Sequence, residues 1–237
     1  MSGRVCELAY GSRRIAYTLR HADRSTLAIS VLPDGTVDVV APLGTVLEDV
    51  QVRVSRRARW ILGQQHYFEQ FRPRTPERRY VSGETHLYLG RQYRLKVVCG
   101  ERESVKLVAG RFLVDVTQSG EPGRVRAILE AWYREKARER LSERFEICWQ
   151  LFSQHHVVPP RMQVRRMRSR WGSLSPSGTL TLNLDLVRAP RDCIDYVILH
   201  ELCHLEHADH GPGFQARLEQ VMPDWQRRKH RLEMTLK

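Results

Sequence analysis

The sequence predicts an α+β protein whose N-terminal half is rich in β-strands and whose C-terminal half is mainly helical. Up to about residue 116, short runs rich in β-branched and aromatic residues alternate apolar with polar positions, and turn residues separate them. From residue 123 onward, apolar residues recur at steps of three and four, which is the spacing of one helix face. We therefore expect a β-rich region over residues 1–120 and a second region over 121–237, either distinct or joined in one continuous domain.

Five runs in the first region are expected to be strands, namely residues 27–31, 37–41, 93–99, 105–108 and 112–116. One helix interrupts them between Thr45 and Phe71, because Val46, Val50, Val54, Ile61 and Tyr67 fall near helical spacing. This helix is expected to end before residues 72–76, whose two prolines are typical of a linker.

The second region begins with a long amphipathic helix predicted from residue 123 to about residue 152. Two strands, over residues 162–167 and 179–184, are expected on either side of a turn at residues 175–178. Pro190 is expected to open a helix that continues to about Glu206. The sequence shows no internal repeat.

Charge and cysteine content restrict the classes of protein to consider. The chain has 39 Lys and Arg against 27 Asp and Glu, a net charge of +12, which favours polyanionic or acidic partners. It has no run of 18 apolar residues, and charges interrupt its N-terminus, so we expect neither a membrane span nor a signal peptide. The five cysteines are scattered and form no CxxC pair, which indicates neither a disulfide framework nor a cysteine zinc site, and favours a cytoplasmic location.

Residues 200–204 have the sequence His-Glu-Leu-Cys-His within the last predicted helix. His200 and His204 are four residues apart, so both imidazoles project from one helix face and can bind one ion. Glu201 can accept a proton from water at such a site. The rest of this helix is apolar, where burying these three residues would be costly without a function. Cys203 points away from this face and is expected in the core.

A catalytic zinc needs a third protein ligand and an open position. His210 is the best candidate, because the segment around Gly211 stops the helix and lets the chain return towards the metal. His207 is the alternative, but in a continuous helix it would lie about 10 Å along the axis from His200. We predict Zn²⁺ bound by His200, His204 and His210.

Several segments together resemble the YgjP-like zinc metallopeptidase family, which is related to the SprT and WLM zincins. They are residues 168–173 (RSRWGS), 178–183 (GTLTLN), Pro190, 194–198 (IDYVI), 200–204 (HELCH) and 210–214 (HGPGF), with weaker likeness at 81–84 (VSGE) and 87–91 (LYLGR). The sequence departs from the family at Leu174, where relatives usually carry a cysteine. The resemblance implies a zincin-like metallohydrolase domain with His200, His204 and His210 as metal ligands and Glu201 as general base.

Four residues upstream of this helix are candidates for substrate binding. Arg168 and Arg170 could hold a carboxylate or phosphate, and Trp171 could stack on a flat group, although all three could equally anchor the hairpin. Asn183 could orient substrate or cap a turn at the end of a strand. His155 and His156 are expected in a surface loop.

The leading functional prediction is a zinc-dependent hydrolase that cleaves peptides with metal-activated water. One alternative is a metal-dependent nucleotide phosphohydrolase of the pyrophosphatase type, since the positive charge suits phosphate. Another is a nucleic-acid-associated binding module with a non-catalytic zinc. Three arginine groups are either solvated faces or polyanion contacts: Arg53, Arg56, Arg57 and Arg59; Arg72, Arg74, Arg78 and Arg79; and Arg161, Arg165 and Arg166.

Overall fold

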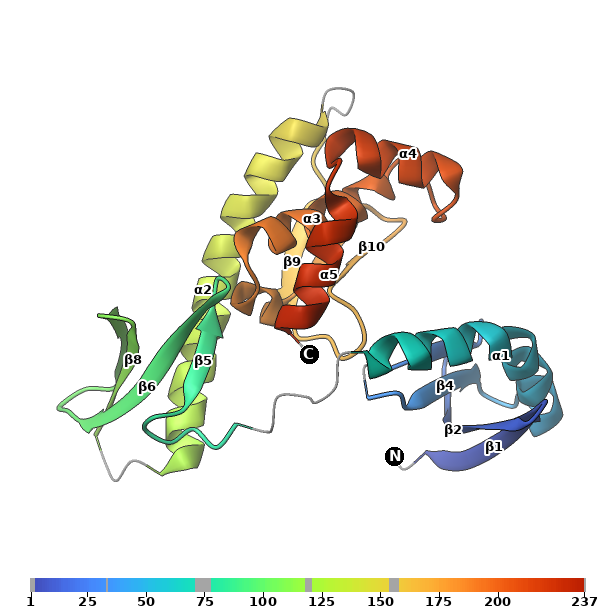
Figure 1. The fold of residues 1–237 in the computed structure, drawn as a ribbon, viewed down its shortest axis with the longest axis horizontal. Helices are drawn as coiled ribbons and strands as arrows, with labels where there is room; N and C mark the ends of the chain where they lie inside the picture. Colours follow the sequence, from blue (N-terminus) through green and yellow to red (C-terminus); the bar gives the residue numbers. More distant parts are fainter. Residues whose placement is uncertain (1–2, 33, 71–77, 118–120, 154–157, 237) are drawn as a thin grey trace. The chain divides into compact units, whose positions relative to one another are not determined.

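The structure is a computed structural model that describes residues 3–32, 34–70, 78–117, 121–153 and 158–236 (Figure 1). The chain divides into two compact units, residues 1–74 and 75–236. The predicted linker at residues 72–76 and the pair His155 and His156 lie outside the described residues.

The N-terminal unit is a four-stranded sheet covered by one helix. Its strands are β1 (Arg4–Tyr10), β2 (Arg13–Ala22), β3 (Ala28–Val31) and β4 (Val37–Pro42). Their order is β1-β2-β4-β3, with β2 parallel to β4 and the other pairs antiparallel. Helix α1 (Leu47–Glu69) buries the apolar face formed by Val50, Val54, Ala58 and Ile61 in a core shared with the sheet.

A second sheet with the same topology opens the larger unit. It contains β5 (Thr85–Tyr88), β6 (Arg91–Cys99), β7 (Ser104–Val108) and β8 (Arg111–Val116), in the order β5-β6-β8-β7. Again the two middle strands are parallel and the outer pairs antiparallel, and a long helix follows. The fold therefore contains a repeated topology that the sequence does not reveal, because a shared topology requires similar apolar patterns and not similar residues.

Helix α2 (Pro122–Phe152) connects this sheet to the C-terminal elements. Its buried residues recur at steps of four and three, from Val125 to Phe152. These α2 residues pack in one core with Phe112 and Val114 of β8 and with Ile198 of helix α3 (Arg191–Cys203). Strands β5–β8 share this core, and the division between compact units follows residue 74.

The C-terminal elements form a small sheet with helices beside it (Figure 1). Strands β9 (Arg161–Arg165), β10 (Gly172–Leu174) and β11 (Thr179–Asn183) are ordered β10-β11-β9. The 3₁₀ helix η2 (Leu184–Arg188) and helices α3 (Arg191–Cys203), α4 (Pro212–Val221) and α5 (Trp225–Thr235) follow. Helix α3 ends three residues before the expected Glu206, because the chain turns there through short-range backbone hydrogen bonds such as Leu205 N–H to Leu202 C=O.

The predicted α+β class with a β-rich N-terminal half is confirmed. Cys203 is fully buried, as predicted, and none of the five cysteines forms a disulfide. Among the helices described, none has both the length and the apolar character to cross a membrane.

Candidate metal centre

Helix α3 brings His200 and His204 to the same side of its C-terminal end. Most of α3 is buried, including Ile194, Ile198 and Leu202, so the core fixes the rotation of the helix about its axis. His200 lies in the last turn and His204 caps the helix, with their ring centroids 5.4 Å apart. The predicted pair therefore projects from one rigid element.

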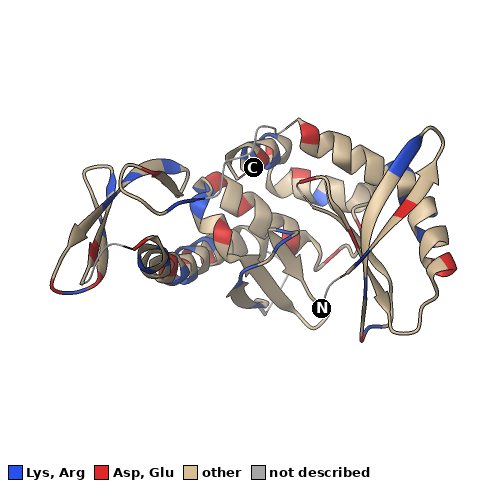
Figure 2. Ribbon diagram, turned by 90° about the horizontal axis from the view of Figure 1, so that it is seen from below, with Lys and Arg blue, Asp and Glu red and all other residues tan. Residues whose placement is uncertain are grey.

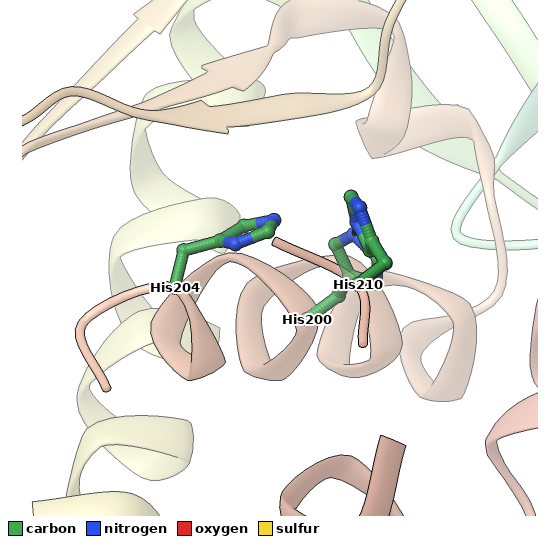
Figure 3. A group of neighbouring side chains, drawn as sticks. All are labelled: His200, His204 and His210. Atoms are coloured by element: carbon green, nitrogen blue, oxygen red, sulfur yellow. Dashed lines mark hydrogen bonds between the residues drawn. The ribbon is translucent and has the colours of Figure 1, made fainter. Parts of the chain in front are cut away.

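His210 approaches the pair from the segment between α3 and α4 (Figure 3). Its Nε2 atom lies 3.0 Å from Nε2 of His200, and each of the three histidines offers a nitrogen within 4.8 Å of the others. His207 does not belong to this group. The structure thus brings together the three histidines that the spacing singled out.

The donor set suits a divalent metal ion. Two nitrogens bound to one tetrahedral zinc at 2.0–2.1 Å lie about 3.3 Å apart, close to the His200–His210 separation. Burial lowers the pKa of His200 to about 3, and burial also lowers the pKa of His210. Both imidazoles are therefore neutral at pH 7, the state that a metal ligand requires.

A backbone hydrogen bond orients the ring of His204. Its Nδ1 atom lies 2.9 Å from the carbonyl oxygen of His207. Because a carbonyl can only accept, Nδ1 carries the proton, which leaves the lone pair of Nε2 available for a metal. His207, the alternative ligand in the sequence, thus contributes through its backbone instead.

Phe214 of α4 supports all three imidazoles. Its ring centroid lies 4.9 Å from that of His200, 4.8 Å from that of His204 and 4.6 Å from that of His210. Phe214 is itself buried in the core. A single apolar side chain therefore restricts the motion of the whole donor set.

Glu201 is a buried carboxyl group beside the histidines, with 8% of its surface exposed. Burial raises the pKa of Glu201 to about 7, while a hydrogen bond from the Leu174 backbone and the positive charge of Arg170 act in the opposite direction. A divalent cation bound nearby would also favour the ionised form. Such a carboxylate can accept a proton from water at neutral pH.

Strand β10 passes directly over this carboxyl group at Gly172. A β-carbon at this position would lie 2.7 Å from Glu201 Cγ, closer than side-chain carbons approach one another. Gly172 therefore provides the space that the Glu201 side chain occupies.

An open cleft of about 560 Å³ contains the site. Strand β10 and the turn after it form one wall, and the three histidines and Glu201 lie along α3 and the segment that follows. Arg170 is the one arginine or lysine among the described residues that line the cleft. The arrangement can hold a metal ion, a water molecule and an extended substrate together.

The other candidates for substrate binding lie outside this lining. Arg168 is exposed, and Trp171 packs against the core. Asn183 is buried and donates hydrogen bonds to the carbonyl groups of Met167 and Arg170. Its amide oxygen accepts from the backbone N–H groups of Met167 and Asp185. These contacts hold the segment before β10 in place, which agrees with the capping alternative.

Sequence reasoning did not assign Gly172 or Phe214 to the site. Both lie within segments that resemble the family, Gly172 beside Trp171 and Phe214 after His210. For Gly172, the only available signal was a small residue next to a tryptophan. For Phe214, it was a phenylalanine directly after the helix-stopping residues Pro212 and Gly213. Neither signal says which side chain lies opposite.

Two metallopeptidase zymogens are among the solved structures to which the chain is similar. Abylysin of Pyrococcus abyssi is 22% identical, with 40% of this chain and 94% of that chain covered and a TM-score of 0.37. Jannalysin of Methanocaldococcus jannaschii is 19% identical, with 41% and 90% covered and a TM-score of 0.37. A comparison with curated proteins gives no significant match.

A match to a protein family covers most of the chain. The YgjP-like metallopeptidase domain matches residues 25–235. This range covers the larger unit except for its last residue, and the greater part of the N-terminal unit. The chain therefore belongs to the YgjP-like metallopeptidase family, whose members are metallohydrolases.

Proposed function

We propose that this chain is a zinc-dependent peptidase in which His200, His204 and His210 hold the metal and Glu201 is the general base. The observation that supports this most directly is the close approach of three imidazoles beside a buried carboxyl group in an open cleft. A purely structural zinc site needs no such carboxyl group and has no open side.

A bound Zn²⁺ ion would act as a Lewis acid that makes water more acidic and polarises the peptide carbonyl. The Glu201 carboxylate accepts a proton from the attacking water and then delivers it to the leaving amine nitrogen. The Leu174 N–H group and Gly172 keep the carboxylate in position during both transfers. Phe214 and the His207 carbonyl keep the imidazoles oriented.

The cleft suits an extended peptide. Strand β10 is an edge strand of its sheet, and Gly172, Ser173 and Leu174 all line the cleft. A peptide can lie along such an edge and form backbone hydrogen bonds that do not depend on its side chains. We therefore expect unfolded segments to be cleaved in preference to folded domains.

The nucleotide phosphohydrolase alternative has less support in the cleft. A triphosphate carries several negative charges and is usually held by multiple cationic or backbone N–H groups. Arg170 is the single arginine or lysine of the described lining, which suits a carboxylate better than a triphosphate. This alternative nevertheless makes a distinct prediction, namely release of pyrophosphate from nucleoside triphosphates.

The test compares wild-type protein with Glu201→Gln and His200→Ala, using a denatured protein and nucleoside triphosphates as substrates. Glu219→Gln, an exposed glutamate on α4, is the matched control. We expect Glu201→Gln to keep its zinc and to lose activity by a factor of about 100 or more. His200→Ala should lose both zinc and activity, and the control should lose neither.

Full peptide cleavage by Glu201→Gln at wild-type zinc content would refute the base assignment. Wild-type protein that releases pyrophosphate and leaves the denatured protein intact would refute the peptidase assignment.

A further inference from the structure

We propose that the N-terminal unit binds single-stranded nucleic acid in a groove between α1 and β3. The groove has a volume of about 400 Å³ and is lined by Leu27, Ile29, Arg53, Arg56, Arg57 and Trp60. We call it the Arg–Trp groove. It contains none of the candidate metal ligands, so this proposal is independent of the proposed peptidase activity.

The four α1 residues of the groove lie on one flank of the helix. Arg56 and Arg57 each lie three or four residues from both Arg53 and Trp60, which places the four side chains along one flank of the helix. The buried face of α1 is formed by other positions, including Val54 and Ala58. The arginines are therefore not needed to hold α1 on the sheet.

Within the described part of the chain, the guanidinium groups of Arg53, Arg56 and Arg57 form no hydrogen bond or ion pair, and all three residues are exposed. The described residues that line the groove include no acidic residue, and the sequence of α1 contains none between positions 50 and 68. Like charges three and four residues apart on a helix repel one another, so this arrangement favours an anionic ligand.

Trp60 gives the groove a flat apolar surface. It is 41% exposed although it is the largest side chain of α1, and Leu27 and Ile29 extend the apolar surface from β3 and the residue before it. Exposed tryptophan beside unpaired arginine is the combination that single-strand binding proteins use, with bases stacked on the ring and phosphates on the cations.

The charge and the ring together favour a nucleic acid over an acidic peptide. Carboxylates of a peptide would satisfy the arginines but would leave the indole face without a matching group. Each nucleotide supplies both a phosphate for a guanidinium and a base for the ring. Lysine and arginine occur in both units (Figure 2), but the Arg–Trp groove adds a stacking surface to its charge.

The experiment measures binding of the full chain to fluorescent oligothymidylate and oligouridylate of about 20 nucleotides by anisotropy, at several salt concentrations. Trp60→Leu should weaken binding at least about five-fold, whereas Trp60→Phe should retain most of it, because the phenyl ring can still stack. Arg53→Gln, Arg56→Gln and Arg57→Gln combined should reduce the slope of log K against log salt by about 2.

A charge-matched control carries Arg13→Gln, Arg14→Gln and Arg59→Gln, three exposed arginines of the same unit outside the groove. It should bind with nearly wild-type affinity, and circular dichroism should show that every variant is folded. Equal weakening by the control triple, or equal binding by Trp60→Leu and Trp60→Phe, would overturn the proposal. Binding of polyglutamate at least as tight as that of the oligonucleotides would assign the groove to acidic peptides instead.

Discussion

Gly172 lies so close to Glu201 that a β-carbon on Gly172 would be 2.8 Å from the Oε1 atom of the glutamate. The two residues belong to different elements, β10 and α3, and their contact determines where the carboxyl group lies in the cleft. The Leu174 N–H group two residues further along β10 holds the same carboxyl group.

Replacing Gly172 with alanine should therefore displace the Glu201 carboxylate. We expect Gly172→Ala to keep its zinc and to lose peptidase activity by a factor of about 10 to 100, the usual cost of a misplaced catalytic group. The measurement is kcat together with zinc content. Gly63→Ala, at a helical glycine with open space around it, is the control and should keep full activity. An unchanged kcat for Gly172→Ala would contradict the positioning argument.

Zinc should stabilise the folded chain, because the three histidines come together only in the native structure. When the concentration of free zinc is about 100 times its dissociation constant, the free energy of unfolding should rise by about 2.7 kcal/mol. Urea unfolding in chelator and in buffered zinc measures this gain. His210→Ala should reduce the gain and leave the stability in chelator almost unchanged, since His210 is exposed. A gain of the same size in His210→Ala would exclude that histidine as a ligand.

The ion pair between Arg144 and Asp195 should contribute to stability. Two hydrogen bonds of 2.7 Å join these side chains of α2 and α3, which are only 20% and 15% exposed. We expect Arg144→Met to lower the free energy of unfolding by about 2 kcal/mol, because it leaves a largely buried carboxylate without its charged partner. Lys136→Met, which removes a more exposed ion pair with Glu139 on α2, should cost less than about 1 kcal/mol. If both variants lost the same free energy of unfolding, burial of the ion pair would have no effect on its contribution to stability.

His86 should make the fold sensitive to acid. Burial lowers the pKa of His86 to about 4, and the charge of Arg78 acts in the same direction. Between pH 6.5 and pH 4 the unfolded chain binds a proton at His86 that the folded chain does not bind, so stability falls as the pH falls through this range. At pH 5 the loss relative to pH 7 should be about 2 kcal/mol.

Urea unfolding at pH 7 and pH 5 tests this prediction. His86→Phe, which keeps an aromatic ring beside Phe112, should show a smaller difference between the two pH values than the wild type. A difference of the same size in both proteins would assign the acid sensitivity to other groups.

Local patterns in the sequence were sufficient for the elements that carry the three histidines. The four-residue spacing of His200 and His204 and the apolar helix around them predicted one helix face with two imidazoles. The helix-stopping residues near Gly211 predicted that His210 could return to this face. These predictions succeed because helical periodicity and chain breaking depend on neighbouring residues only.

Tertiary structure alone decided the parallel pairing of β2 with β4, the placement of β5–β8 with α2 and the roles of Gly172 and Phe214. The sequence determined that three histidines and a glutamate could meet at the end of one helix. Only the fold determined what surrounds them, because contacts between residues distant in the chain depend on how complete elements pack.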